Sequence, residues 1–166
     1  RRKGGDRAGG RGGWAAAGVG SGMVAVAQAG DGGGSIRMPA RRGGMFGLKR
    51  SRGRVSLGPV EAESWGGLGM RHVVSRSVRD SAAILDCTHG QEPGARYVAP
   101  NPAAPFLSML DRDPKPLRIA LMTRPPSGAP VDRQCLEATL AAAKLCESLG
   151  HHGEEAGRGR WEEQTY

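Results

Sequence analysis

The sequence predicts an α/β fold. Residues Leu117 to Met122 form an apolar run of strand length. The segment from Asp132 to Leu149 follows with helical spacing, because Leu136, Leu140 and Ala143 fall along one side. A strand followed by a helix is typical of α/β domains.

The first part of the chain is built from small residues. Residues 1–13 are rich in Gly and Arg, which favours a disordered or loop segment. The small apolar residues between Ala15 and Val24 favour a helix, and Ala25 to Ala29 favours a short buried strand. Beyond Ser35 we expect an apolar loop and then a buried element at Met45 to Leu48.

Turns and linkers fill most of the middle of the chain. The charge run from Lys49 to Arg54 is expected to be a solvated turn. Residues Pro59 to Gly69 are expected to be irregular, with Trp65 as their one large anchor. The prolines between Ala99 and Pro105 favour an extended linker.

One amphipathic helix is expected between these segments, from Ser77 to His89. Ser77 and Asp80 stand at the spacing of a capping box, and Gly90 follows at the position where glycine ends helices. The apolar residues that share one side are Val78, Ala82 and Leu85.

Charge is concentrated in the first part of the sequence. Residues 1–60 hold 12 Lys and Arg against 2 Asp and Glu, a net charge of +10, whereas residues 61–166 carry a net charge of −2. Such a basic segment attracts nucleic acid or anionic surfaces without specifying either. A Gly/Arg-rich nucleic-acid-binding protein without catalytic activity is therefore one hypothesis for this chain.

Cysteine use and hydropathy limit the other classes. Cys87, Cys135 and Cys146 form no pair or Cys/His set at metal-ligand spacing, so we expect no metal site and no cofactor. Cys135 and Cys146 are expected on a buried helix face. Sparse cysteines fit a reducing cytoplasm. No apolar run reaches the roughly 20 residues of a membrane span.

The most informative stretch is the glycine-rich loop that ends at Ser35. Gly32, Gly33 and Gly34 can turn several backbone N–H groups toward one point, because glycine tolerates positive φ and has no Cβ. A hydroxyl among open N–H groups suits a nucleophile beside an oxyanion. Ser35 is therefore the candidate nucleophile, and an incidental serine in a surface loop is the alternative.

Other catalytic motifs are missing from the sequence. It contains no phosphate-binding loop of the Gly-x-x-x-x-Gly-Lys-Ser/Thr type. Arg37 stands where a nucleophile elbow requires glycine. A triad with histidine has no local support, and the four histidines are expected at the surface or at helix ends. They are His72, His89, His151 and His152.

The segments around Ser35 resemble the amidase signature family. The resemblance is carried by Gly30 to Ala40, with its Gly-Gly-Ser-Ile-Arg core, by Gly44 to Lys49 and by Ser51 to Val55. It continues through most of residues 15–152. The Trp-Gly-Gly-Leu segment at Trp65 and the Ser-Arg-Ser-Val-Arg-Asp segment at Ser75 look most like the branch that includes 6-aminohexanoate cyclic dimer hydrolase.

This resemblance implies an enzyme that hydrolyses amides, with a small-molecule amide as substrate rather than nucleic acid or a membrane. The serine nucleophile of the family maps onto Ser35. The oxyanion hole maps onto the N–H groups of Gly32, Gly33, Gly34 and Ser35 itself. Asp31 and Arg37, on either side of the loop, are implied to have a structural role.

The resemblance also shows departures from the Ser, cis-Ser, Lys triad of the family. The bridging serine falls on Arg11, which has no acceptor and stays protonated, so it cannot relay a proton. The triad lysine falls before the first residue, and Lys3 and Lys49 are in the wrong places. Losing triad members removes most of the rate, so we expect the chain to be impaired or inactive as written.

We therefore expect a partial amidase-signature fold, a mixed sheet with flanking helices that is incomplete. Its expected domains are a Gly/Arg-rich segment at 1–13, a partial amidase domain at 14–152 and a disordered tail at 153–166, which lacks the strand that follows the helix in the family. Arg41, Arg42 and Arg50 would place charge beside a buried segment, which is costly unless the side chains reach water. The sequence gives no indication of the specific amide or of the oligomeric state.

Overall fold

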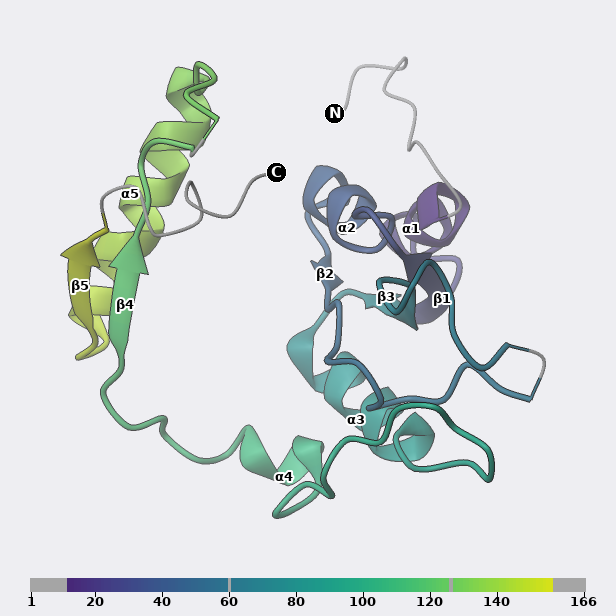
Figure 1. Cartoon of the computed structure of the whole chain (residues 1–166). Helices are drawn as coiled ribbons and strands as arrows, with labels where there is room; N and C mark the ends of the chain where they lie inside the picture. The colour runs from purple at the N-terminus through teal and green to yellow at the C-terminus, as the bar shows by residue number, and fades with distance from the viewer. Residues whose placement is uncertain (1–11, 60, 126, 157–166) are drawn as a thin grey trace. The chain divides into compact units, whose positions relative to one another are not determined.

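The computed structural model describes residues 12–59, 61–125 and 127–156. The chain divides into two compact units, one through Arg112 and the other from Asp113. In the first unit the elements in chain order are α1 (Gly12–Gly20), β1 (Val26–Asp31), α2 (Arg37–Gly43), β2 (Phe46–Gly47), β3 (Met70–Ser75), α3 (Val78–Thr88) and α4 (Phe106–Met109) (Figure 1).

The first unit is organised around an antiparallel sheet with the order β1-β3-β2. Strand β3 pairs with β1 from Val26 opposite Ser75 to Asp31 opposite Met70, and Phe46 of β2 pairs with Ser75 as well. The sequence analysis did not predict β3. Its polar residues His72 and Ser75 are buried, so the strand shows no alternation of polar and apolar side chains.

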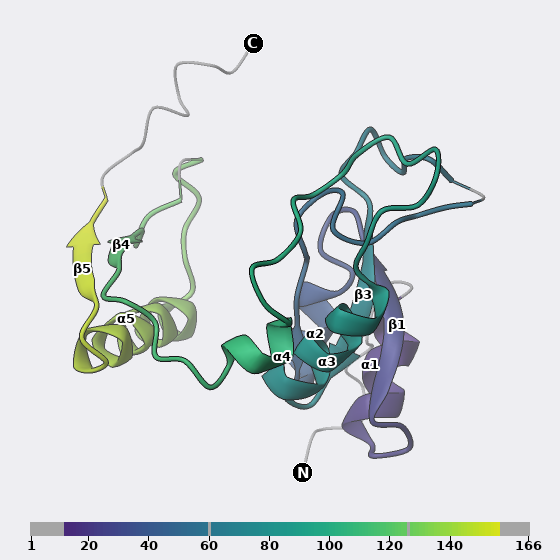
Figure 2. The ribbon, with the colours of Figure 1, turned by 90° about the horizontal axis from the view of Figure 1, so that it is seen from below.

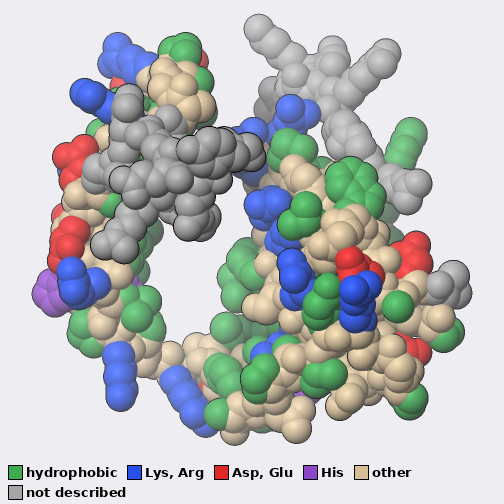
Figure 3. All heavy atoms as spheres, viewed as in Figure 1, with side chains coloured by type: hydrophobic (Ala, Val, Ile, Leu, Met, Phe, Trp, Pro, Cys, Tyr) green, Lys and Arg blue, Asp and Glu red, His purple; other side chains and the backbone are tan. Residues whose placement is uncertain are grey.

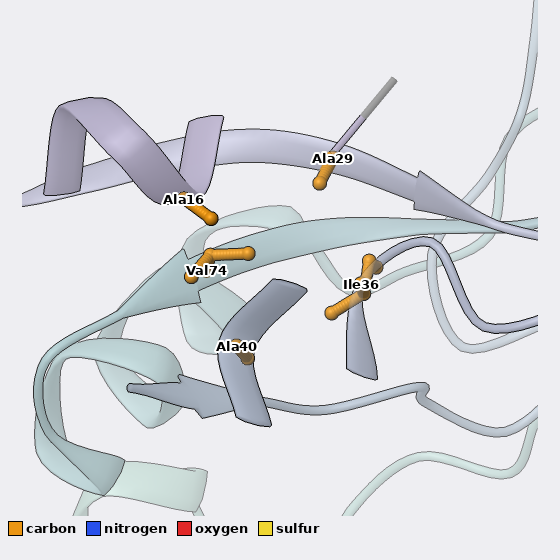
Figure 4. Packing of buried hydrophobic residues seen from close by; sticks show 5 residues of the cluster. All are labelled: Ala16, Ala29, Ile36, Ala40 and Val74. Atoms are coloured by element: carbon orange, nitrogen blue, oxygen red, sulfur yellow. The ribbon is translucent and has the colours of Figure 1, made fainter. Parts of the chain in front are cut away.

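Small side chains let two helices approach this sheet closely. Ala16 of α1, Val74 of β3 and Ala40 of α2 point toward one another, and Ala29 and Ile36 complete the buried cluster (Figure 4). The predicted small-residue helix is confirmed as α1, although it ends before Met23 and Val24, which are exposed. It begins at Gly12, so the last two residues of the segment 1–13, expected to be disordered or a loop, are helical, and the rest of that segment lies outside the described residues. The predicted strand at Ala25 to Ala29 is confirmed as β1.

Helix α2 occupies the segment expected to be an apolar loop. Pro39 lies in its first turn, where the missing N–H of proline costs no intrahelical hydrogen bond. The helix ends at Gly44, whose φ of 65° places it in the left-handed region. The side chains of Arg41 and Arg42 are exposed at its last turn, so they do not carry charge into the core.

Helix α3 confirms the predicted amphipathic helix and its cap. The hydroxyl of Ser77 accepts the N–H of Asp80 at 3.0 Å, and Ala82 and Leu85 are buried. Val78, expected on the same face, is exposed. Helix α4 lies beside α3 (Figure 2), and Asp86 accepts the N–H of Phe106 at 2.7 Å.

The second unit is a β-α-β arrangement, with β4 (Arg118–Leu121), α5 (Arg133–Ser148) and β5 (His152–Glu155). The two strands are parallel and Arg118 pairs with His152. Asp132 caps α5 by accepting the N–H of Gln134 at 2.8 Å. The predicted strand and helix are thus confirmed, and their α/β character with them.

Strand β5 corrects the expected tail. The segment from residue 153 was expected to be disordered and to lack the strand of the family, yet residues 152–155 form a strand in register with β4. Residues 157–166 lie outside the described residues. None of the residues in β4, α5 and β5 is buried, so Cys135, expected on a buried face, is exposed and Cys146 is half-buried.

Three further expectations about burial are wrong. Trp65 does not anchor its segment in a core, because 73% of it is exposed. Arg50 is not in a solvated turn, because only 5% of it is exposed. His72 is buried within β3 and is neither at the surface nor at a helix end.

Candidate functional site: a glycine loop held by Asp31

The glycine loop joins the end of β1 to the start of α2. Strand β1 ends at Asp31, and α2 begins at Arg37. Ser35 lies between them and is half-buried. The strand and the helix are both packed in the core through Ala29 and Ala40, so the two ends of the loop are fixed.

Asp31 is the centre of the hydrogen bonds in the loop. Its carboxylate is 1% exposed and accepts the N–H of Gly34 at 2.7 Å. It also accepts the N–H groups of Ile36 and Arg37, both at 3.3 Å. The Arg37 guanidinium donates Nε at 2.9 Å and Nη2 at 3.0 Å to the two carboxylate oxygens. The structural role expected for Asp31 and Arg37 therefore has a geometric basis.

These contacts keep Asp31 ionised. Burial alone raises the pKa of the Asp31 carboxyl, but hydrogen bonds from the Arg37 side chain and from the N–H groups of Arg37, Gly34 and Ile36 outweigh burial and lower the pKa well below its ordinary value. The same pairing raises the pKa of Arg37. The loop is thus built around a buried carboxylate that is ionised at neutral pH.

The N–H groups of the loop fall into two sets, those that donate to the Asp31 carboxylate and those that do not. The N–H of Gly34 is donated to Asp31, so the structure gives it a different use from the oxyanion role expected for it. The backbone of Gly34 has a φ of 125°, a conformation that residues with a side chain rarely adopt. Within the described part of the chain, the N–H groups of Gly32, Gly33 and Ser35 have no hydrogen-bond acceptor.

Ser35 is close to Gly12, the residue that follows the degenerate bridging position in the sequence. A Cβ on Gly12 would overlap the carbonyl oxygen of Ser35, so the backbone at Gly12 lies directly against the candidate nucleophile. Arg11 itself lies outside the described residues. The hydroxyl of Ser35 has no hydrogen-bond partner among the described residues.

Lys49 is near the loop but is not placed as a base for Ser35. Its ammonium donates to the carbonyl oxygen of Gly32 at 2.6 Å and lies 3.4 Å from Oδ1 of Asp31. An ammonium used as a hydrogen-bond donor and paired with a carboxylate offers no lone pair. The expectation that Lys49 is in the wrong place for the triad agrees with this geometry. Lys3 lies outside the described residues.

Trp65 is a site residue that the sequence analysis did not identify as such. Atoms of its six-membered ring would lie 2.8 to 3.1 Å from a Cβ on Gly32, so the indole covers the first glycine of the loop. Its φ of 53° is left-handed, and Gly66 and Gly67 also have positive φ. Hydrogen bonds from Gly67 and Gly69 to the carbonyl oxygen of Ser64 hold this turn.

A second buried polar group lies on the other side of β3. Arg50 donates Nε to the carbonyl of Arg71 at 3.1 Å and Nη1 to that of Ser51 at 3.1 Å, whereas its buried Nη2 has no partner among the described residues. Burial lowers the pKa of Arg50 to about 10. His72 is hydrogen-bonded to Ser81 at 2.8 Å, and burial, followed by the charge of Arg50, lowers its pKa.

The remaining features are separate from the loop. A cavity of about 230 Å³ lies among residues 50–70 and 92–97, and no residue of the glycine loop lines it. Within the described ranges, no group of three His, Cys, Asp or Glu side chains is arranged to hold a metal ion. No described helix has the length and apolar character that crossing a membrane requires. On the visible face of the first unit, Lys and Arg side chains lie beside Asp and Glu (Figure 3).

Comparison with known proteins extends this geometry. The profile of the protein family described as Amidase matches residues 5–162. The chain is 37% identical over 151 residues to the 6-aminohexanoate-cyclic-dimer hydrolase of Pseudomonas sp. strain NK87, covering 89% of this chain and 31% of that protein.

Two solved structures share the fold. A 6-aminohexanoate cyclic dimer hydrolase complexed with substrate matches 89% of this chain and 31% of its own, with a TM-score of 0.83 and 35% identity. A bacterial aryl acylamidase of the amidase signature family matches 92% of this chain and 31% of its own, with a TM-score of 0.80 and 31% identity. The chain thus spans about a third of the length of these relatives.

Proposed function

The chain belongs to the amidase family, and we propose that it supplies the serine nucleophile and the oxyanion loop of an amide hydrolase. The observation that supports this proposal best is the sorting of N–H groups by Asp31. It accepts the N–H groups of Gly34, Ile36 and Arg37, whereas those of Gly33 and Ser35 have no acceptor among the described residues.

The proposed reaction begins at Ser35. Its Oγ attacks the carbonyl carbon of the amide, a C–O bond forms, and the carbonyl oxygen becomes an oxyanion as the hydroxyl proton passes to a base. The C–N bond then breaks, the amine leaves with a proton, and water releases the acid from Ser35. Free N–H groups at Gly33 and Ser35 stabilise the oxyanion, and one such donor is typically worth about 2.7 to 4 kcal/mol of barrier. Gly32 offers a third free N–H.

Among the described residues, no side chain is hydrogen-bonded to the Ser35 hydroxyl as a base. Lys49 is engaged with Gly32 and Asp31, and position 11, where the resemblance places the bridging serine, is an arginine. We propose that the chain does not turn over simple amides without the remaining part of an amidase fold. The matched region does not identify which amide is the substrate, because the relatives are about three times as long as this region. A cytoplasmic location, suggested by the sparse unpaired cysteines, is also a proposal.

Acylation by an activated ester tests the nucleophile without requiring the base. In alkaline buffer, 4-nitrophenyl acetate should acetylate Ser35 faster than the exposed Ser108, because the free N–H groups stabilise the tetrahedral intermediate. Peptide mass spectrometry over time measures both rates, and Ser35→Ala is the control for assignment. Equal acetylation of the two serines would contradict the proposed nucleophile.

Turnover tests the second part of the proposal. Simple aliphatic and anilide amides should give no product at a rate that depends on Ser35. Turnover by the 166-residue chain that disappears in Ser35→Ala would show that a base is present after all. The alternative of a nucleic-acid-binding protein has no support in the comparisons.

A further inference from the structure

Lys49 makes a contact that the proposed reaction does not use. It lies two residues beyond β2, and the loop follows β1, so strands on both sides of β3 bring the lysine and the loop together. Its side chain is 20% exposed. The contact to the Gly32 carbonyl, at 2.6 Å, is much shorter than the 3.4 Å that separates the ammonium from Asp31. The peptide oxygen is therefore its principal partner.

A hydrogen bond to the carbonyl of Gly32 fixes the N–H of Gly33 as well. The two groups belong to one planar trans peptide and point in opposite directions. The next peptide is fixed in a similar way, because Asp31 accepts the N–H of Gly34. The two contacts therefore hold two successive peptides of the loop. The N–H of Gly34 points toward the Asp31 carboxylate, and the N–H of Gly33 points away from the Lys49 ammonium.

Packing cannot set the orientation of Gly33. It is exposed, and a Cβ at this position would meet no atom within 4 Å. A glycine in open space has the largest choice of backbone conformations, and ordering one residue costs about 1–2 kcal/mol. The orientation of its N–H must therefore come from hydrogen bonds to the neighbouring peptides.

We propose that Lys49 is a positioning residue that aims the Gly33 N–H at the oxyanion formed on Ser35. The oxyanion role of this N–H rests on the proposed function, whereas the hydrogen bond from Lys49 to Gly32 does not depend on it. Lys49 does not touch the substrate. It acts through the Gly32–Gly33 peptide, and Arg37 supplies the charge that Asp31 needs independently of it.

Backbone NMR of the isotope-labelled full chain tests the proposal directly. The variants are Lys49→Met, which removes the donor, Lys49→Arg, which keeps one, and Lys115→Met, a matched control at an exposed lysine of the second unit. The readouts are the residual dipolar coupling of the Gly33 N–H, which reports its direction, and its order parameter.

In Lys49→Met the Gly33 order parameter should fall from about 0.85 to below about 0.6, and its coupling should average toward zero. The N–H groups of Ile36 and Arg37 should keep their values, because Asp31 still holds them. Lys49→Arg should restore the Gly33 coupling, and Lys115→Met should not change it.

An unchanged Gly33 coupling in folded Lys49→Met would overturn the proposal. If Lys49→Met does not fold, Lys49→Arg decides, because a folded arginine variant that loses the Gly33 coupling contradicts the proposed role and one that keeps it supports the role. None of these readouts requires hydrolysis. A failure of the Ser35 acylation test therefore remains distinguishable from a failure of this inference.

Discussion

Asp31 and Arg50 are two buried charges of the same compact unit, and they differ in how completely they are paired. Asp31 accepts five hydrogen bonds from Gly34, Ile36 and Arg37 and lies 3.4 Å from the Lys49 ammonium. The buried Nη2 of Arg50 has no partner in the part of the chain that the structure describes. A buried charge organises its surroundings when its hydrogen-bonding capacity is filled, and it costs stability when it is not.

The difference has a local cause. Asp31 ends β1 just before the turn that leads into α2, and both the turn and the start of the helix offer N–H groups without intrahelical partners. Arg50 lies beside the first residues of β3, which pair with β1 but not with β2. The carbonyl of Arg71 is one of the few acceptors that it reaches there.

The largest effect should come from Asp31→Asn. It removes the anion while the Arg37 guanidinium and the loop N–H groups remain, so the free energy of unfolding of the first unit should fall by about 3–5 kcal/mol. Urea unfolding followed by tryptophan fluorescence measures this change. Asp113→Asn, at an exposed carboxylate, is the matched control. Equal stability of the two variants would mean that Asp31 is not the centre of the loop.

Arg37→Met should have a smaller effect of the same sign. It removes two hydrogen bonds to Asp31 but leaves three N–H donors and Lys49, so we expect a loss of about 2 kcal/mol. The exposed Arg41 of the same helix provides the control, Arg41→Met. A loss as large as that of Asp31→Asn would show that the backbone donors contribute little.

Arg50→Met should change stability in the opposite direction. Methionine fills similar space without a buried unpaired nitrogen, so the free energy of unfolding should rise by about 1 kcal/mol. Removing this charge should also raise the pKa of His72, which an NMR titration of the histidines can follow. Destabilisation of the variant would instead mean that the bonds to Arg71 and Ser51 outweigh the cost of Nη2.

The last effect is a dependence of stability on pH in two separate windows. The pKa of His72 lies below its ordinary value of 6.5, so the unfolded chain binds the proton first and stability should fall as the pH drops below that value. The pKa of Asp31 lies below 3.8, so its contribution should persist above that value and be lost at lower pH. Unfolding by urea at several pH values measures both windows. In His72→Gln, the fall in stability below pH 6.5 should disappear and the loss at low pH should remain. A fall below pH 6.5 that persists in this variant would contradict its assignment to His72.

The cap of α3 could be predicted because Ser77 reaches the N–H of Asp80 across three residues, a spacing that is visible in the sequence. The hydrogen bonds of Asp31 also span only three to six residues, but they were not predicted, and the N–H of Gly34 was expected at the oxyanion. The burial of His72 was not predictable in this way, because it depends on Ser81 from another element packing against β3.

The sequence by itself determined the loop, its candidate nucleophile, the α3 helix with its cap, the α5 helix, and the resemblance to the family. The tertiary structure decided which N–H groups of the loop remain free, that Lys49 holds Gly32 from 17 residues away, and that Trp65 covers the same glycine. It also decided that β3 is the central strand and that Arg50 is buried. Hydrogen bonds within a turn follow from residue spacing, whereas contacts between distant segments follow from the path of the folded chain.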